Sequence, residues 1–251
     1  MFSNEQLRIH IKLALITLRW KWQDVTHGSD EIINILGDSH TRYFRFLQRT
    51  YPLAATHLRV FNVTGATASG LRNPHSKTRA SMAFGFLLRR LDKKQVLLMQ
   101  LGEVDCGFAL WMKAAKHGNR AEDELQRAFD NYMVSIRNAR ELGFEKILIA
   151  TVSPPTIADW SLWRGPVGHL RRQVAADIRE RSQLTRLFNQ LLREGASAVG
   201  YTFLDVENLF TDPQTSLVRP ELLSDRPGDL HLHNHEAAKI YRKALLAAHF
   251  L

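Results

Sequence analysis

The chain has 251 residues, of which 45% are hydrophobic and 24% are charged, and this balance excludes a disordered or collagen-like protein. Lysine and arginine number 34 against 25 aspartates and glutamates, so the formal net charge is +9. The single cysteine, Cys106, excludes an internal disulfide. No apolar run approaches the roughly 18 residues of a spanning helix, and the length suits one large α/β domain with a sizeable core.

Residues 7–25 predict an amphipathic helix rather than a signal peptide. Their apolar centre is short, charged residues interrupt it, and no small-residue cleavage site follows, so we expect the chain to be cytoplasmic. Ser3 or Asn4 is suited to cap the helix. Large apolar side chains recur at helical spacing, namely Leu7, Ile11, Leu15, Leu18 and Trp22.

We expect this amino-terminal helix, within residues 1–28, to pack on the rest of the domain. Its cations suggest an alternative, because a basic helix with aromatic side chains can lie on anionic lipid. These residues are Arg8, Lys12, Arg19 and Lys21, beside Trp20 and Trp22. The sequence therefore leaves open a weak contact with a membrane surface.

Short β-rich runs alternate with longer helical stretches along the rest of the chain. Strands are predicted over residues 32–36, 58–63, 96–101, 146–152 and 201–206, since near-continuous apolar runs are typical of strands buried on both faces. Helices are predicted over residues 41–49, 76–91, 121–142, 170–194 and 236–250, with Gly143 and Gly195 ending two of them. Repeated strand–helix units indicate a parallel sheet covered by helices on both sides. No repeat or linker divides the chain, so we expect one domain over residues 1–251.

Ligands of such sheets bind beyond the carboxyl ends of the strands, and polar residues follow several of the predicted strands. They occupy residues 38–40, 64–67, 103–106 and 153–155, together with a late loop over residues 229–233. These segments bring a serine, several carboxylates and a group of histidines to one edge. The sequence therefore predicts the functional site there.

Ser39 lies at a strand-to-helix turn, where a serine is either a helix cap or an exposed nucleophile. Asp229 precedes His231 by two residues, so an extended backbone places both side chains on one face. Asp229 could then orient His231, and His231 could accept the proton of Ser39. Gly65 offers a backbone N–H that a developing oxyanion can approach closely.

Four blocks of the sequence, in this order, resemble the motifs of the SGNH (GDSL-like) hydrolase superfamily. They are Gly37-Asp38-Ser39-His40, Asn62-Val63-Thr64-Gly65-Ala66-Thr67, Leu101-Gly102-Glu103-Val104-Asp105 and Asp229-Leu230-His231-Leu232. The resemblance spans residues 32–250. It implies Ser39 as nucleophile, His231 and Asp229 as its partners, and the N–H groups of Ser39 and Gly65 as oxyanion hole. It also implies a three-layer α/β/α flavodoxin-like sandwich around a central five-stranded parallel sheet.

Two positions depart from the family pattern. The third block usually reads Gly-x-Asn-Asp, with the asparagine as an oxyanion donor, whereas this chain has Val104 there. Losing one such donor typically lowers the rate by roughly 100- to 1000-fold. Asn62, Asn73 or Glu103 could replace it, or the enzyme is slow, or catalysis is lost. The last block reads Asp-x-His rather than Asp-x-x-His, a spacing that some polysaccharide-modifying relatives share.

The run Gly-Glu-Val-Asp-Cys resembles a subgroup with Gly-Glu-Ile-Asp-Cys that is often found near carbohydrate-modifying genes. We therefore expect a serine esterase or deacetylase acting on an acylated carbohydrate or a related small metabolite, without a cofactor. The alternatives are a sugar O-acyltransferase with acetyl-CoA as donor and a catalytically degenerate binding domain. Substrate contacts are expected among Asp38, His40, Asn73, Glu103, Asp105 and His233, although Asp105 equally suits a structural role.

Other residue groups have competing interpretations. His231, His233 and His235 alternate with Asp229 and could hold a metal, but no second cluster is present in the sequence and we expect no metal. Cys106 has no histidine neighbour in sequence and suits a small buried residue better than a nucleophile. Three tryptophans, Trp111, Trp160 and Trp163, follow strands and could stack on sugars or cover the core.

The positive excess gathers in two regions. One comprises Arg164, Arg171, Arg172, Arg179, Arg181, Arg186 and Arg193, and the other comprises Arg72, Lys77 and Arg79. These cations predict solvated helix faces, or contact with an anionic donor, glycan or lipid. No nucleic-acid-binding signature accompanies them, so we expect no nucleic-acid partner.

Overall fold

A computed structural model of the chain describes residues 4–27, 31–51, 53, 56–158, 166–226 and 228–251. In these residues five parallel strands form one sheet: β1 (Glu31–Gly37), β2 (Thr56–Asn62), β3 (Val96–Gln100), β4 (Ile147–Ala150) and β5 (Thr202–Leu204). Their spatial order is β2-β1-β3-β4-β5, which is the flavodoxin-like order of doubly wound sheets. The predicted fold class is therefore confirmed.

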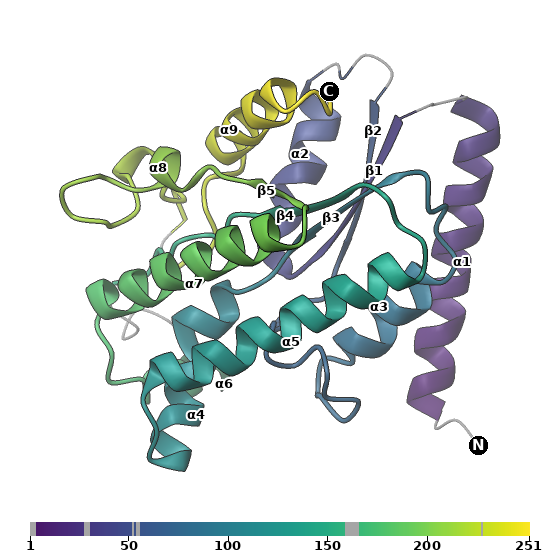
Figure 1. Cartoon of the computed structure of the whole chain (residues 1–251). Coiled ribbons are helices and arrows are strands. Elements are labelled where there is room, and N and C mark those ends of the chain that lie inside the picture. The colour runs from purple at the N-terminus through teal and green to yellow at the C-terminus, as the bar shows by residue number, and fades with distance from the viewer. Residues whose placement is uncertain (1–3, 28–30, 52, 54–55, 159–165, 227) are drawn as a thin grey trace.

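Helices cover both faces of this sheet (Figure 1). The longer ones are α1 (Asn4–His27), α2 (Arg42–Thr50), α3 (Ala80–Leu88), α5 (Ala121–Glu141), α7 (Ile178–Ala198) and α9 (Asn234–Ala247). Shorter ones are α4 (Leu110–His117), α6 (Pro166–Arg171) and α8 (Glu207–Phe210), with helical turns η1 (Ser39–Thr41), η2 (Asp105–Ala109) and η4 (Pro220–Leu222). Among the described helices, none is long and apolar enough to cross a membrane.

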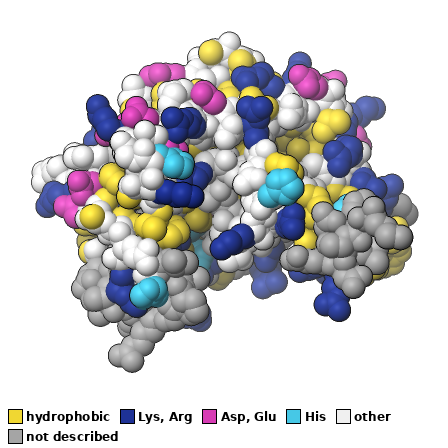
Figure 2. All heavy atoms as spheres, turned by 90° about the horizontal axis from the view of Figure 1, so that it is seen from below, with side chains coloured by type: hydrophobic (Ala, Val, Ile, Leu, Met, Phe, Trp, Pro, Cys, Tyr) yellow, Lys and Arg dark blue, Asp and Glu magenta, His cyan; other side chains and the backbone are white. Residues whose placement is uncertain are grey.

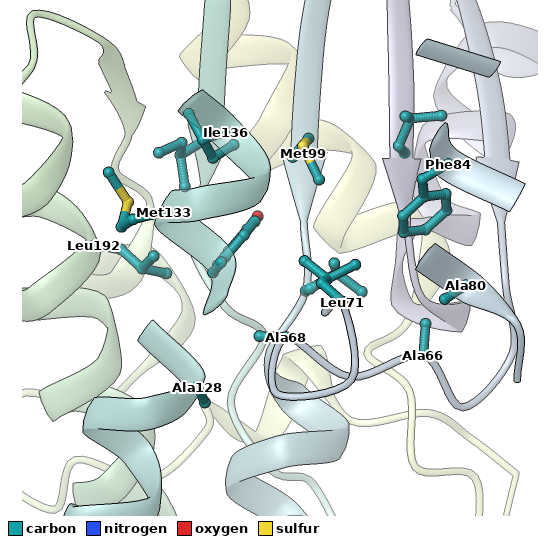
Figure 3. Packing of buried hydrophobic residues seen from close by; sticks show 14 of the residues in the cluster. Ala66, Ala68, Leu71, Ala80, Phe84, Met99, Ala128, Met133, Ile136 and Leu192 are labelled. Atoms are coloured by element: carbon teal, nitrogen blue, oxygen red, sulfur yellow. The ribbon is translucent and has the colours of Figure 1, made fainter. Parts of the chain in front are cut away.

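Successive side chains along a strand pack into two different hydrophobic cores, one on each face of the sheet. Leu97 and Met99 of β3 face the core shared with α3, α5 and α7, and Figure 3 shows Met99 among side chains of these helices. Leu98 of the same strand faces the core shared with α2 and α9. Because successive strand side chains point to opposite faces, one apolar run is enough to anchor both helical layers.

The strand register places the carboxyl ends of β1, β2 and β3 at one level. Gly37 is paired with Asn62 on β2 and with Gln100 on β3, and the Val63 N–H donates to the Gly37 carbonyl at 2.9 Å. The loops after these three strands consequently leave the sheet side by side.

Two predicted helices have different limits in the structure. The helix expected over residues 76–91 begins only at Ala80, because residues 66–79 form a series of turns. The helix expected over residues 170–194 is divided between α6 and α7. Asp177 starts α7 with a capping box, in which its carboxylate accepts the Glu180 N–H at 2.8 Å and Glu180 accepts the Asp177 N–H. The helical segment over residues 105–117 was not predicted.

Gly195 does not end α7, contrary to the prediction. The helix continues to Ala198, and Gly200 takes the left-handed conformation with φ +72°. A Cβ at position 195 would lie 2.8 Å from Phe129 Cζ of α5. Gly195 therefore permits the close approach of two helices, whereas Gly143, with φ +103°, ends α5 as expected.

Helix α1 packs beside α3 and the edge strand β2, but not through the apolar stripe that marked it in the sequence. Its inner side buries Leu13 and Thr17, and Arg59 of β2 donates to the Trp20 carbonyl at 2.9 Å. The stripe residues Ile11, Leu15, Leu18 and Trp22 are all exposed, and the side chain of Leu7 lies outside the described part.

Candidate active site

Ser39 occupies the first position of a helical turn directly after β1. The Asp38 carboxylate caps this turn by accepting the His40 N–H at 2.8 Å, and the Thr41 hydroxyl donates to the Asp38 carbonyl at 2.9 Å. Asp38, His40 and Thr41 are buried, whereas Ser39 is half-buried. The capped turn therefore fixes the backbone and leaves the serine side chain accessible.

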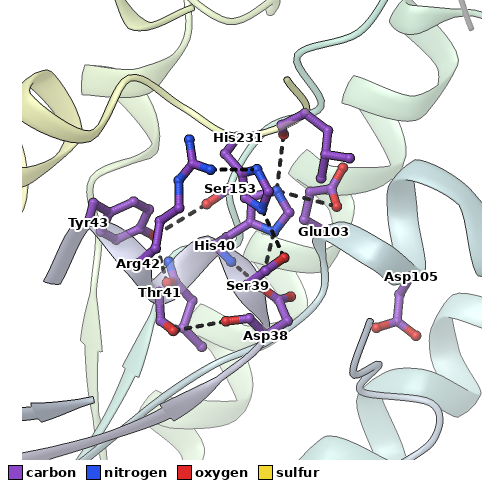
Figure 4. Close-up of polar contacts among 12 residues, drawn as sticks. Asp38, Ser39, His40, Thr41, Arg42, Tyr43, Glu103, Asp105, Ser153 and His231 are labelled. Carbon is purple, nitrogen blue, oxygen red and sulfur yellow. Dashed lines mark hydrogen bonds and ion pairs between the residues drawn. The ribbon is translucent and has the colours of Figure 1, made fainter. Parts of the chain in front are cut away.

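Ser39, His231 and Asp229 form a continuous hydrogen-bonded chain. His231 Nε2 lies 2.9 Å from Ser39 Oγ, and His231 Nδ1 lies 2.6 Å from Asp229 Oδ1. Figure 4 shows Ser39, His40 and His231 gathered at this turn. Because a carboxylate only accepts, Nδ1 carries the proton and Nε2 is the acceptor for the serine hydroxyl.

Arg42 is a member of the site that the sequence reasoning missed. It lies three residues after Ser39, in the first turn of α2, and its Nη2 donates to Asp229 Oδ2 at 2.8 Å. Its Nε also donates to Asn234 Oδ1 at 3.0 Å. Burial raises the pKa of the Asp229 carboxyl, but the hydrogen bonds from Arg42 and His231 outweigh this and hold the pKa well below its usual range. The i, i+3 spacing from Ser39 was the only signal in the sequence.

His40 is buried against the catalytic histidine candidate. Its Nδ1 lies 3.0 Å from Asp38 Oδ1, and its Nε2 lies 3.1 Å from the Leu230 carbonyl and 3.5 Å from Glu103 Oε2. Burial lowers the pKa of His40, but the carboxylates of Glu103 and Asp38 outweigh it and raise the pKa to about 9. His40 is thus a cation at neutral pH.

His231 has the opposite protonation state. Burial and the charge of His40 lower its pKa to about 4, even though Asp229 acts to raise it. His231 is therefore neutral at neutral pH, which is the form that accepts a proton.

The third block of the sequence supports the site from inside the protein. Asp105 is buried and accepts the N–H groups of Ala68 at 2.6 Å and Ser69 at 3.1 Å, so it fastens the loop after β2. Figure 4 shows it lying apart from the histidines. Glu103 is also buried and faces His40 and, at 3.9 Å, Arg171. Val104, also buried, occupies the place where the resemblance expects an asparagine.

The two backbone N–H groups predicted as the oxyanion hole belong to the turns after β1 and β2. Gly65 lies in the turn after β2 with φ +73°, a conformation that favours glycine. The Val63 N–H donates to the Gly37 carbonyl where the two strands end. The turn that contains Gly65 and the turn that contains Ser39 therefore start from adjacent positions. Within the described residues, neither the Ser39 nor the Gly65 N–H donates a backbone hydrogen bond.

Several other predicted residues lie outside this cluster. Asn73 is in an exposed turn, where it accepts the His75 N–H at 2.9 Å. Asn62 accepts from Arg45 at 2.9 Å. His233 precedes α9 and lies 3.5 Å from the exposed Asp225. In the described part of the chain, no group of three His, Cys, Asp or Glu side chains could hold a metal.

Cys106 and Trp111, which the sequence offered as a nucleophile and as a sugar-stacking side chain, make contacts inside the protein. Cys106 is buried, and burial raises the pKa of its thiol, which disfavours the thiolate. Trp111 donates to the Cys106 carbonyl at 2.7 Å, while Trp160, Trp163 and Arg164 lie outside the described residues.

The prediction of solvated helix faces is wrong for two arginines. Arg171 and Arg181 are buried, and Arg181 donates to the Ile157 carbonyl at 2.7 Å. Arg193 is only partly exposed and pairs with Asp205 at 2.7 Å. Arg172, Arg179 and Arg186 are exposed, as the prediction of solvated helix faces expects.

Solved structures that are similar in fold to this chain include a lipase and two esterases. A GDSL-like lipase from Bacteroides thetaiotaomicron is 12% identical, with a TM-score of 0.52 over 92% of this chain and 99% of that one. The aryl esterase of M. smegmatis is 13% identical, with a TM-score of 0.56 over 88% and 100%. Est24, a carbohydrate acetylesterase from Sinorhizobium meliloti, is 10% identical, with a TM-score of 0.57 over 88% and 100%. No protein-family model matches the sequence, and no curated protein does.

Proposed function

We propose that this chain is a serine-dependent ester hydrolase with Ser39 as its nucleophile. The observation that carries the proposal is the hydrogen-bonded chain from Ser39 through His231 to Asp229, at the carboxyl edge of a parallel sheet. A lone capping serine would need neither a histidine acceptor nor a carboxylate behind it. The esterase fold of the similar structures supports the same conclusion.

In the proposed reaction, Ser39 Oγ attacks the ester carbonyl while His231 Nε2 takes its proton. The resulting tetrahedral oxyanion is stabilised by the N–H groups of Ser39 and Gly65. Collapse breaks the bond to the alcohol, which receives the proton from His231 and leaves an acyl group on Ser39. Water then attacks this acyl-enzyme with His231 as base, releasing the acid and restoring the serine.

The local charges set limits on this reaction. Protonated His231 is stabilised by Asp229, but it lies beside the cations His40 and Arg42. The two neighbouring cations keep His231 from holding the proton strongly, and they favour its transfer from His231 to the leaving alcohol. Val104 supplies no third oxyanion donor, so we expect turnover roughly 100- to 1000-fold slower than with a complete hole.

The substrate class that we propose is a small acyl ester of a carbohydrate or related metabolite. Est24 gives one example of a carbohydrate acetylesterase on this fold. Lys and Arg side chains are spread over the face at the carboxyl edge of the sheet, where the substrate would approach (Figure 2). Such a surface favours anionic substrates, and it also suits acetyl-CoA as the donor of a sugar O-acyltransferase.

Labelling with a fluorophosphonate probe tests the nucleophile. We expect the wild-type chain to be labelled, Ser39→Ala to be unlabelled, and Ser81→Ala, a matched change of a half-buried serine on α3, to be labelled like wild type. Equal labelling of Ser39→Ala would overturn the assignment. Absence of any labelling would support the second candidate function. In that case the chain is a binding domain that lost catalysis because Val104 replaces the asparagine of the family pattern.

Acetyl-CoA turnover separates hydrolysis from transfer. Release of CoA that increases when a sugar acceptor is added would assign the chain as a transferase. Hydrolysis of aryl acetates without such an increase would support the hydrolase.

A further inference from the structure

The outward face of α1 combines large apolar side chains with cations. Residues 8, 11, 12, 15, 18, 19 and 22 follow helical spacing along one side, and all of them are exposed. The apolar members Ile11, Leu15, Leu18 and Trp22 are 52%, 62%, 63% and 68% exposed. The next most exposed large apolar side chain in the described residues is Leu209, at 49%. This concentration on one helix face is unusual for a surface that only meets water.

Packing of α1 does not require this face. The opposite side buries Leu13 and Thr17, and Ile9, Ala14 and Trp20 pack against the same core. The helix is therefore anchored from its inner side, while the apolar side chains of its outer side are largely exposed.

Cations accompany the exposed apolar residues on this helix. Arg8, Lys12 and Arg19 lie on the outward face itself, and Lys21 is exposed beside it. Residues 8–22 contain no Asp or Glu. A face of this composition matches the boundary between lipid headgroups and acyl chains.

A basic cavity adjoins this face. It is a hollow of about 540 Å³, open to the surface, between α1, α2 and β2, and its described lining includes Lys12, Arg19, Arg45, Arg49, His57 and Arg59 but no acidic residue. Arg45 donates to the Val60 carbonyl and to Asn62 rather than to a carboxylate. Burial and the charge of Arg49 lower the pKa of Arg45, which indicates crowded positive charge.

We propose that α1 and this cavity form a docking surface for an anionic lipid bilayer. Headgroup phosphates would contact the cations that Lys12 and Arg19 contribute to both features, and Leu15, Leu18 and Trp22 would enter the acyl boundary. A second copy of the chain is a poorer occupant, because a two-fold contact through α1 would oppose like charges. The proposal is independent of the chemistry assigned to Ser39.

Vesicle co-sedimentation tests this surface. We expect the full chain to sediment with phosphatidylcholine vesicles that contain phosphatidylglycerol, to remain free with phosphatidylcholine alone, and to dissociate as salt is added. Leu15→Ser/Leu18→Ser/Trp22→Ser should weaken binding by about tenfold or more. Lys12→Gln/Arg19→Gln should weaken it by about fivefold for each charge removed.

Matched variants show whether the position of these residues matters. Leu209→Ser/Leu246→Ser changes exposed apolar residues elsewhere, and Arg137→Gln/Lys146→Gln removes two exposed cations elsewhere. Both should bind like wild type, with circular dichroism establishing that all variants are folded. Equal loss in these controls, equal binding to neutral vesicles or no binding by the wild type would overturn the proposal. A dimer in light scattering that only the α1 variants dissociate, without vesicle binding, would assign the face to a second copy.

Discussion

His40 and His231 lie against each other, with ring centroids 4.6 Å apart and ring planes inclined by 38°. The two histidines nevertheless have opposite protonation states at neutral pH. Glu103 and Asp38 stabilise the charge on His40, whereas burial and the neighbouring His40 cation keep His231 neutral. The His40 cation therefore tunes the pKa of the proposed base, His231.

The rate of ester hydrolysis should depend on the protonation of His231. Only neutral imidazole accepts the Ser39 proton, so activity should fall as the pH drops through the pKa of His231, with a midpoint near 4. His40→Gln removes the adjacent cation and should raise that midpoint by about one unit or more. The pH profile of kcat/KM measures both values.

His75→Gln serves as the control for this change, because His75 lies in an exposed turn. Its midpoint should equal that of the wild type. A wild-type midpoint near the ordinary histidine value, or no shift in His40→Gln, would contradict the assigned coupling.

Arg42 should act as a positioning residue for Asp229 and His231. Arg42→Gln removes a charged hydrogen bond to Asp229, and such bonds are worth about 1.5–3 kcal/mol, or about 10- to 100-fold in rate. We expect this loss mainly in kcat, together with a changed pH midpoint. Arg45→Gln, on the same helix but bonded to Asn62, should keep wild-type kinetics. Equal effects of the two changes would indicate a role of Arg42 in stability alone.

Val104→Asn should restore a donor to the oxyanion hole. If the side chain reaches the developing oxyanion, kcat should rise by about tenfold or more. Because Val104 is buried, the same change should lower stability by about 1–3 kcal/mol. Val104→Ala controls for the altered packing and should show no gain in rate. Identical rates for the asparagine and alanine variants would separate this position from the oxyanion hole.

Gly195→Ala should destabilise the chain even though alanine favours helices. The new Cβ would lie 2.8 Å from Phe129 Cζ, and such overpacking costs about 1–3 kcal/mol. Urea unfolding measures the change. Ser197→Ala, at an exposed position two residues later, should be neutral or slightly stabilising. A stabilised Gly195→Ala would show that Phe129 moves aside freely.

Local composition was enough to locate the strands and the catalytic candidates. The central strands β1, β3 and β4 are largely apolar runs, as burial on both faces requires. The edge strands β2 and β5 are partly exposed and carry more polar residues. The ends of parallel strands meet at one edge, so the sequence alone predicts that Ser39 lies near the loop carrying Asp229 and His231.

Other features depended on neighbours that are distant in sequence. The periodicity of the sequence shows an apolar stripe on α1. In the structure the opposite side of this helix packs beside α3 and β2, so the stripe faces outward. Gly195 resembled a helix end until the position of Phe129 was known. Arg42 and the His40–His231 pair acquire their roles only through contacts across about 190 residues of chain. A one-dimensional pattern records which faces are apolar or charged, whereas their partners are selected by packing and by the electrostatics of burial.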